Sequence, residues 1–384
     1  MRRADGVLRI GFVVGNLGRG GAELQLLQLA AGLVARGHEV SVFAYDGPSV
    51  LDHEFHTAGV EVVAKSLHGR AQKVSTIRRW MRRSRFHVVH GIMKRASSLA
   101  VLARLPRRRP AVIATDFSSV TYGRRTPVLW LILGAFVLAD QVVTEIELNR
   151  ANLERLAPWL RGKTMIVRNG LDTARFVPNV ARGARTHDEP FRFCVVATLS
   201  VVKNPLRVVA AVAELRRRGH ERFRVDWYGR DGLPERVNLG GIARAQAATL
   251  GLHDHLVFHG DAPCIERAYR RSDALLHASV AEGFPNAVSE AMACGLPIAV
   301  SRVSDLPQVV AEAQNGIVFD ETDPTSMADA MEHMMTLPHD ELAAMGSRSR
   351  ALAVHWFGSE RYIAEYEDLY WQMTLKRSPA AECA

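Results

Sequence analysis

The chain alternates short, continuous apolar runs with longer segments in which apolar residues recur at helical spacing. The first half opens with an apolar run at 8–14, a helical pattern from about 22 to 36, and a second run at 39–44. Uninterrupted runs of this length are typical of strands buried on both faces of a parallel sheet. The order strand, helix, strand therefore predicts an α/β fold.

The alternation of apolar runs and helical patterns continues along the chain, is interrupted at 179–190 and then resumes. Further runs predict strands at 87–90, 111–115, 141–144, 193–197, 226–230, 256–260 and 274–278. A chain of 384 residues is too long for one ordinary core, so we predict two Rossmann-like domains. The expected parts are a first domain at 1–178, a linker at 179–190, a second domain at 191–358, a terminal helix at 359–376 and a flexible tail at 377–384. An aromatic stripe on that helix, which includes Tyr362, Tyr366 and Tyr370, is expected to pack back across the domain boundary.

Composition is that of a globular protein, with 48% hydrophobic and 23% charged residues. The longest apolar run, 127–139, is shorter than the ~20 residues of a membrane-spanning helix. It predicts either a core helix or an interfacial one. The four cysteines are scattered and form no Cys-x-x-Cys pair, so neither a zinc site nor a disulfide framework is indicated. A reducing cytoplasm fits this pattern, and the N-terminus has no signal-peptide features.

Charge is distributed unevenly along the chain. Residues 1–180 hold 27 Lys and Arg against 13 Asp and Glu, whereas the remainder has a balance of −5. Arg78, Arg79, Arg82 and Arg83 recur at helical spacing within the basic half. This pattern favours a surface for anionic lipid or a lipid-linked acceptor, although a solvated arginine-rich face is an alternative. Nucleic acid is disfavoured, because no nucleic-acid-binding motif is present and only 7% of residues are aromatic.

Two carboxylates flank a predicted loop-to-helix junction after the strand at 274–278. Glu282 falls in the loop at the carboxyl end of that strand, and Glu290 falls about one turn into a helix that Asn286 is expected to cap and Gly295 to end. Helix N-terminal N–H groups favour a diphosphate between the two acids. Lys203, just past the strand at 193–197, would face the same sheet edge and neutralise charge on a departing diphosphate. The plainer alternatives are a helix-turn role for Glu290 and a surface ion pair for Lys203.

The spacing Glu-x7-Glu, followed by Ala-Met-Ala-Cys-Gly-Leu-Pro, resembles retaining glycosyltransferase family 4, whose architecture is called GT-B. The loop Gly20-Gly21-Ala22-Glu23 and the position of Lys203 match the same family, and the resemblance covers nearly the whole chain. It implies two domains facing a central cleft, with Glu282 on the donor sugar and Glu290 on the ribose of the nucleotide. Many relatives have Gly-Arg shortly before the lysine, where this chain has Ala197-Thr198.

That departure leaves leaving-group stabilisation to Lys203 and helix dipoles, with help from either Arg230 or Arg302. The expected donor-binding residues are Gly20, Gly21, Lys203, Arg230, Glu282, Gly283, Phe284, Pro285, Asn286, Ala287 and Glu290. Relatives often carry a histidine after the strand at 111–115, and Asp116 holds that place here. We therefore assign Asp116, together with His90 and Lys94, to the acceptor side, and Glu282, Lys203 and Asp116 to catalysis. A purely structural turn role for Asp116 is the alternative.

The chain has no Asp-x-Asp pair and no histidine cluster, so we predict a transferase without metal or cofactor. The resemblance implies a retaining hexosyltransferase that uses a nucleotide-diphosphate sugar, with a UDP-sugar favoured. The expected acceptor is a lipid-linked or polysaccharide intermediate of exopolysaccharide, capsule or lipopolysaccharide assembly, met at the inner face of the plasma membrane. Alternatives are a sugar-nucleotide epimerase of the same fold, a soluble transferase acting on a small acceptor, and a non-catalytic protein that binds lipid or polyanion.

Overall fold

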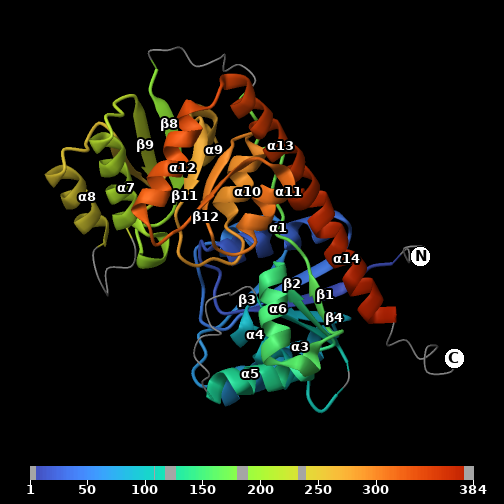
Figure 1. Cartoon of the computed structure of the whole chain (residues 1–384). Coiled ribbons are helices and arrows are strands. Elements are labelled where there is room, and N and C mark those ends of the chain that lie inside the picture. The colour runs from blue at the N-terminus through green and yellow to red at the C-terminus, as the bar shows by residue number, and fades with distance from the viewer. Residues whose placement is uncertain (1–5, 108, 117–126, 180–188, 232–238, 376–384) are drawn as a thin grey trace. The chain divides into compact units, whose positions relative to one another are not determined.

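The computed structural model describes residues 6–107, 109–116, 127–179, 189–231 and 239–375. It divides into two compact units, Met1–Gly170 with Ser359–Ala384, and Leu171–Gly358 (Figure 1). Each unit is built on one parallel sheet whose strands alternate with helices. The predicted α/β class is therefore confirmed.

The first unit has a seven-stranded sheet in the order β3-β2-β1-β4-β5-β6-β7. Its strands are β1 (Arg9–Val14), β2 (Glu39–Ala44), β3 (Glu61–Ala64), β4 (Val88–Gly91), β5 (Ala111–Asp116), β6 (Gln141–Thr144) and β7 (Thr164–Ile166). Its helices are α1 (Gly21–Ala35), α2 (Asp52–Thr57), α3 (Arg70–Ser84), α4 (Lys94–Arg104), α5 (Pro127–Val137), α6 (Glu147–Leu156), the short η2 (Pro158–Leu160) and α14 (Ser359–Leu375). The strand order reverses between β1 and β4, and ligands bind beside the carboxyl ends of strands at such a reversal.

The second unit has a six-stranded sheet in the order β10-β9-β8-β11-β12-β13. Its strands are β8 (Phe191–Val196), β9 (Phe223–Tyr228), β10 (Leu256–Gly260), β11 (Ala274–His277), β12 (Ile298–Ser301) and β13 (Gly316–Phe319). Its helices are η3 (Val201–Lys203), α7 (Pro205–Arg217), α8 (Leu239–Thr249), α9 (Ile265–Arg271), α10 (Asn286–Ala293), α11 (Leu306–Ala313), α12 (Pro324–Thr336) and α13 (His339–Phe357). The reversal here lies between β8 and β11, so the loops after these strands are adjacent.

The chain passes between the units at Gly170, whereas the sequence placed the end of the first domain at 178. The difference arises because the segment after Gly170 packs on the second unit. Arg350 Nη1 donates to Phe176 O at 2.6 Å and Arg350 Nη2 donates to Thr173 O at 3.0 Å. Most of the predicted linker, 180–188, and the predicted tail lie outside the described residues.

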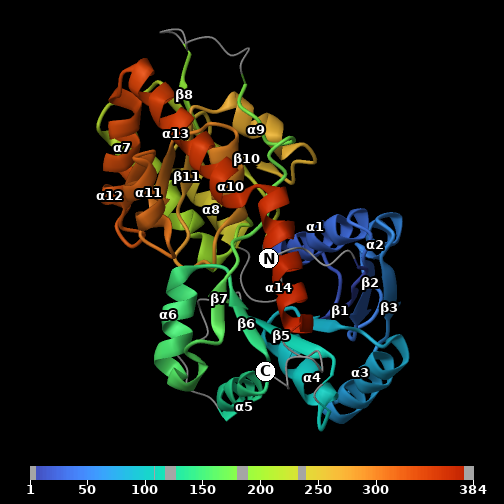
Figure 2. The same ribbon diagram turned by 90° about the vertical axis from the view of Figure 1, so that its right-hand side faces the viewer.

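Helix α14 returns to the first unit, although about 190 residues of the second unit separate it from β7 in sequence. The helix lies beside the first sheet (Figure 2). Its aromatic stripe joins the core formed by β1 and α1, where Tyr362, Tyr366 and Tyr370 are all buried. A methyl group on Gly32 of α1 would lie 2.2 Å from Ile363 Cδ1, so glycine permits this close approach of the two helices. The predicted packing of the terminal helix is therefore present within the first unit.

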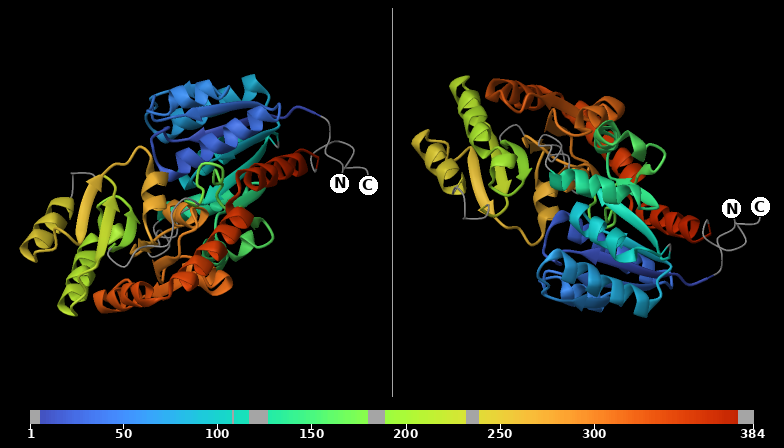
Figure 3. Two further views of the ribbon diagram at one scale, coloured as in Figure 1. Left: turned by 90° about the horizontal axis from the view of Figure 1, so that it is seen from above. Right: turned by 90° about the horizontal axis from the view of Figure 1, so that it is seen from below.

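The apolar run at 127–139 forms α5, and its two faces differ. Helices cover both faces of the first sheet, and α5 shares a core with α3 and α4, separate from the core that holds α1 and α14 (Figure 3). Leu129, Leu133 and Phe136 are buried in that core, whereas Leu131 is 64% exposed and Trp130 is 43% exposed. The buried side of α5 agrees with the predicted core helix, and the interfacial alternative stays a prediction for its exposed side. No helix in the described part of the chain has the length and apolarity needed to cross a membrane.

Candidate active site

Lys203, Glu282 and His277 form a charged cluster at the carboxyl edge of the second sheet. Lys203 ends η3 after β8, and Glu282 lies in the loop after β11. The two loops are tied together, because Val280 N donates to Val202 O at 2.8 Å. Lys203 Nζ donates a hydrogen bond to Glu282 Oε1, and His277 Nε2 lies 3.4 Å from the same oxygen. The structure therefore brings together two of the residues that the sequence assigns to the donor, Lys203 and Glu282.

The electrostatics of this cluster keep Glu282 ionised. Burial alone would raise the pKa of Glu282, but the hydrogen bond from His277 and the charge of Lys203 outweigh it and hold the pKa at about 2. Burial lowers the pKa of His277, since the ring is almost fully covered. A carboxylate thus faces an ammonium group at a sheet edge.

Glu290 belongs to the same motif as Glu282, but its surroundings shift its pKa in the other direction. Its side chain lies on α10, and Tyr269 Oη donates to Glu290 Oε2 at 2.8 Å. Burial raises the pKa of Glu290 to about 7. The carboxyl group is therefore poised to change its protonation state near neutral pH, unlike that of Glu282.

The loop from Gly283 to Ala287 leads into α10 and differs from the predicted capping. The helix begins at Asn286, the capping position is held by Pro285, and no side chain caps the helix. The prediction that Asn286 is the cap was wrong, because Pro285 has the extended backbone of that position and Asn286 is already helical. Phe284 anchors the loop by packing on Phe357, with ring centroids 4.8 Å apart. Gly295, with φ +76°, follows the end of the helix as predicted.

Arg230 lies at the same edge of the second sheet, directly after β9. Its carbonyl oxygen accepts a hydrogen bond from Leu199 N at 2.9 Å, which places it beside the loop that carries Lys203. The side chain is exposed. Arg230 is therefore a third charged residue near this loop, and its contact with a donor stays a prediction.

The glycine-rich loop of the first unit leads into α1, with Gly20 at the capping position and Gly21 as the first helical residue. A methyl group on Gly20 would lie 2.3 Å from Glu23 Oε2. The Glu23 carboxylate thus covers the start of its own helix, and burial raises its pKa. The sequence indicates Glu23 only as part of the Gly-Gly-Ala-Glu match and does not predict this position.

Asp116 and Lys94 meet at the carboxyl edge of the first sheet. Asp116 ends β5 and is fully buried, Lys94 begins α4, and Lys94 Nζ lies 3.3 Å from Asp116 Oδ1. These two residues were predicted together on the acceptor side. The structure gives a salt bridge between them, which supports a shared position without testing contact with an acceptor.

His90 has a different place from the expected one. Its ring is fully buried, Nδ1 lies 2.8 Å from Tyr370 Oη, and Nε2 is hydrogen-bonded to Thr115 Oγ1. Burial lowers the pKa of His90 to about 3, so the ring is neutral. Because both nitrogens are engaged inside the unit, His90 holds α14 against the sheet and does not present a free nitrogen to an acceptor.

We expect Tyr370→Phe to lower the free energy of unfolding by about 1–3 kcal/mol, since a buried ring nitrogen of His90 loses its partner. Urea denaturation followed by tryptophan fluorescence measures this change. Tyr45→Phe, in the same unit, is a control, because no hydrogen bond of the Tyr45 hydroxyl is present among the described residues. Equal changes in the free energy of unfolding for the two substitutions would show that the Tyr370–His90 hydrogen bond does not stabilise the folded protein.

The sequence gives no indication that His277 contacts Glu282 or that Tyr269 contacts Glu290. His277 was treated as part of an apolar strand, and Tyr269 received no assignment. One signal was available, since His277 is the polar end of an otherwise apolar strand five residues before Glu282. The position of Tyr269 on α9 gives no comparable signal.

Two parallel-sheet α/β units with a returning terminal helix define the GT-B fold. The crystal structure of Anabaena Alr3699/HepE in complex with UDP aligns with a TM-score of 0.83 and 16% identity, covering 95% of this chain and all of that one. The structure of WaaG, a glycosyltransferase involved in lipopolysaccharide biosynthesis, aligns with a TM-score of 0.70 and 15% identity, over 94% of this chain and 99% of that one. At these identities the likeness establishes the fold.

Family models place the chain more narrowly. The model "Glycosyltransferase Family 4" matches residues 19–175, and "Glycosyl transferases group 1" matches residues 180–352. The chain belongs to this family of glycosyltransferases, as its motifs predicted.

The curated relatives differ in how much of their length is matched. N-acetyl-alpha-D-glucosaminyl L-malate synthase of Bacillus anthracis is 31% identical over 32% of this chain and 32% of its own length. D-inositol 3-phosphate glycosyltransferase 2 of Catenulispora acidiphila is 29% identical over 60% of this chain and 56% of its length. Spore coat protein SA of Bacillus subtilis is 26% identical over 92% of this chain and 95% of its length. The chain thus spans only a third to just over half of the first two relatives.

Proposed function

We propose that this protein is a retaining glycosyltransferase that moves a hexose from a nucleotide-diphosphate sugar to an acceptor hydroxyl without a metal ion. The observation that carries the proposal is the Lys203–Glu282 pair beside the start of α10, with Glu290 one turn further along that helix. This arrangement offers a cation and helix N–H groups to a diphosphate and a carboxylate on either side to hydroxyl groups.

The donor we propose is a UDP-sugar. The support is that the structurally similar Anabaena Alr3699/HepE was crystallised with UDP and with UDP-glucose. In our proposal Glu290 accepts hydrogen bonds from the ribose, and the loop Gly283–Ala287 lies along the diphosphate. From the first unit, the family resemblance assigns Gly20 and Gly21 to the same diphosphate.

In the proposed reaction Lys203 changes its ionic partner from Glu282 to the donor diphosphate. In the structure the charge of Lys203 is paired with that of Glu282. When donor binds, the ammonium group would turn to the diphosphate, and Glu282 would become an acceptor for sugar hydroxyls. As the anomeric bond breaks, negative charge grows on the diphosphate, where Lys203 and the α10 N-terminus stabilise it. The acceptor hydroxyl would attack from the same face, which retains configuration and needs no nucleophile from the protein.

We propose a lipid-linked or polysaccharide acceptor met at the inner face of the plasma membrane. Support comes from the exposed side of α5, where Leu131 and Trp130 are accompanied by Trp159 of η2, 52% exposed, with the two indole rings 6.4 Å apart. Paired exposed tryptophans are typical of surfaces that meet the membrane interface. The excess of basic residues in the first 180 positions would attract anionic headgroups.

The donor assignment predicts that one class of nucleotide sugar raises the melting temperature of the purified protein. The panel comprises UDP-, GDP-, ADP- and CMP-sugars with EDTA present, because metal-free binding is part of the proposal. A ligand that binds only the folded state at 100 times its Kd adds about 2.7 kcal/mol to the free energy of unfolding. Glu290→Ala should remove the shift.

Product analysis then separates the enzyme classes. Transfer to an added glycan or lipid acceptor, with the anomeric configuration read by NMR, supports a retaining transferase. If the protein instead converts the nucleotide sugar to a different nucleotide sugar without any acceptor, the result would favour an epimerase of the same fold. No shift with any nucleotide sugar, alongside binding to anionic liposomes, would favour a non-catalytic lipid-binding protein.

A further inference from the structure

A concave site lies in the first unit, at the edge of the sheet opposite Asp116. The pocket has a volume of about 810 Å³ and is bordered by the amino ends of three strands, since Arg9 begins β1, His87 precedes β4 and Ala111 begins β5. Residues in a parallel strand advance about 3.3 Å each, so the length of β5 separates the pocket from Asp116 by roughly 17 Å. It is therefore distinct from the candidate acceptor site.

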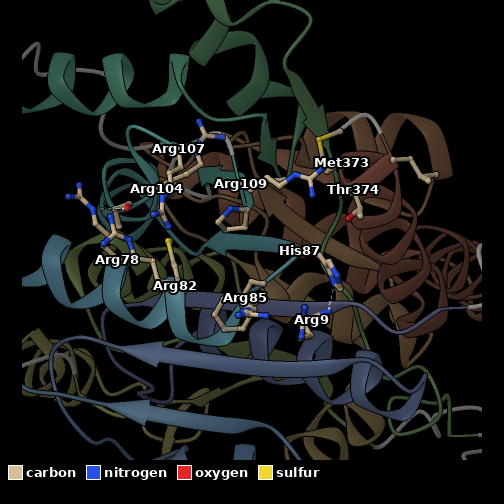
Figure 4. Close-up of a pocket in the computed structure, with 16 residues that line it drawn as sticks. Arg9, Arg78, Arg82, Arg85, His87, Arg104, Arg107, Arg109, Met373 and Thr374 are labelled. Atoms are coloured by element: carbon tan, nitrogen blue, oxygen red, sulfur yellow. Dashed lines mark hydrogen bonds between the residues drawn. The ribbon is translucent and has the colours of Figure 1, made fainter. Parts of the chain in front are cut away.

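The pocket, which we name the arginine pocket, is strongly cationic (Figure 4). Seven arginines line it, and none of the described residues that line it is acidic. Buried apolar side chains, including Met81, Phe86 and Met373, form part of its wall. Charges of one sign beside walls of low polarity focus the electric field, which strengthens attraction for an anion.

Two of the arginines are held in the framework of the unit. Arg78 Nε donates to Ala103 O at 3.0 Å, which fixes α3 to the last turn of α4. Arg104 is only 8% exposed and its Nη1 lies 2.7 Å from Asp140 Oδ2, yet its Nε has no hydrogen-bond partner among the described atoms. A buried N–H group without a partner is costly, so this guanidinium points to an acceptor that the described residues do not supply.

Three further arginines stand at the exposed rim. Arg82, Arg85 and Arg107 line the pocket and make no side-chain hydrogen bond or ion pair with a described residue. A single exposed arginine of this kind is ordinary. Here all three line the same pocket as the buried Arg104 (Figure 4), and guanidinium groups bind phosphate oxygens in a two-pronged geometry.

We propose that the arginine pocket binds an anionic ligand carrying two or more phosphate groups. Asp140 already pairs with Arg104, but one phosphate dianion would balance only two of the other six guanidinium charges that line the pocket. The same chemistry is offered by a free polyphosphate compound and by phosphate headgroups of a membrane. Met373 and Thr374 of α14 also line the pocket, so a bound ligand would brace the last turn of that helix.

The test is calorimetric titration with pyrophosphate at constant ionic strength, on protein carrying Lys203→Gln so that the proposed donor site does not contribute. The variant Arg82→Gln/Arg85→Gln should weaken pyrophosphate binding at least tenfold. Its matched control is Arg79→Gln/Arg83→Gln, which removes two exposed arginines of α3 that do not line the pocket. Flotation with vesicles containing phosphatidylglycerol, compared with neutral vesicles, forms the second arm.

Saturable pyrophosphate binding that only the Arg82/Arg85 pair disrupts supports the proposal with a soluble ligand. Vesicle binding that the same pair disrupts, and that pyrophosphate displaces, supports it with a membrane phosphate. Absence of binding in both arms, or equal loss in the two pairs, overturns it, since general attraction to a basic surface would then be enough. Melting temperatures of both pairs within 2 °C of the parent exclude unfolding as the cause of any loss.

Discussion

Replacing Lys203 by methionine is expected to lower turnover about 10²–10³-fold, the range found when one group that stabilises developing negative charge is removed. The ammonium group pairs with the Glu282 oxygen that the buried His277 also approaches. Lys203 is also the only lysine between residues 171 and 375. Methionine keeps most of the length and the apolar stem of the side chain, so the change chiefly removes charge.

Turnover and KM are to be measured with the nucleotide sugar identified by thermal stabilisation. We expect turnover to fall more than donor KM rises, because the charge on the diphosphate grows as the bond breaks. Arg217→Met, in the last turn of the following helix α7, is the control, since Arg217 pairs with Glu214 at the surface. Turnover of Lys203→Met within threefold of the parent would exclude Lys203 from leaving-group stabilisation.

Much of the fold could be predicted because the strands of a doubly covered parallel sheet are continuous apolar runs. The strands predicted at 39–44 and 141–144 are found with those bounds. The end of the first domain was harder to place. It depends on whether the irregular segment 171–179 packs on one unit or the other, which long-range hydrogen bonds from Arg350 decide.

The candidate site was predictable where it lies in a local motif and obscure where it depends on sheet order. Glu282 and Glu290 are set by one loop and one helix, so their spacing is visible in the sequence. His277 contacts Glu282 because β11 carries both to the same edge beside β8, and its apolar neighbours conceal it. His90 was misplaced for a related reason, since its partner Tyr370 lies 280 residues away on α14.

The substitution Glu290→Gln is expected to remove a loss of stability that the parent protein suffers as pH rises. Burial raises the pKa of Glu290 from 4.5 to about 7, so between these values the folded state holds a proton that the unfolded state has released. The free energy of unfolding therefore falls with rising pH in this window, by up to about 3 kcal/mol once the carboxylate is fully ionised. The amide of the variant cannot ionise, and its oxygen can still accept the hydrogen bond from Tyr269.

The measurement is urea denaturation of both proteins at pH 5 and pH 8, read as the difference between Glu290→Gln and parent. The free energy of unfolding of the variant, taken relative to that of the parent, should rise by about 1–3 kcal/mol from pH 5 to pH 8. Glu341→Gln, at an exposed position of α13, is the matched control and should show no such gain. Parallel profiles for Glu290→Gln and parent would mean that Glu290 is already ionised in the folded state below pH 5.

The same substitution links protonation to donor binding. Ribose hydroxyls donate hydrogen bonds more strongly to a carboxylate than to a neutral carboxyl group, so a bound donor favours loss of the Glu290 proton. Donor affinity of the parent should therefore rise from pH 5.5 to pH 8, by up to tenfold for each pH unit below the pKa. The affinity of Glu290→Gln should be weaker at pH 8 and nearly independent of pH. A parent affinity that does not change across this range would place the ribose elsewhere, because a carboxyl group that binds it cannot titrate without altering the affinity.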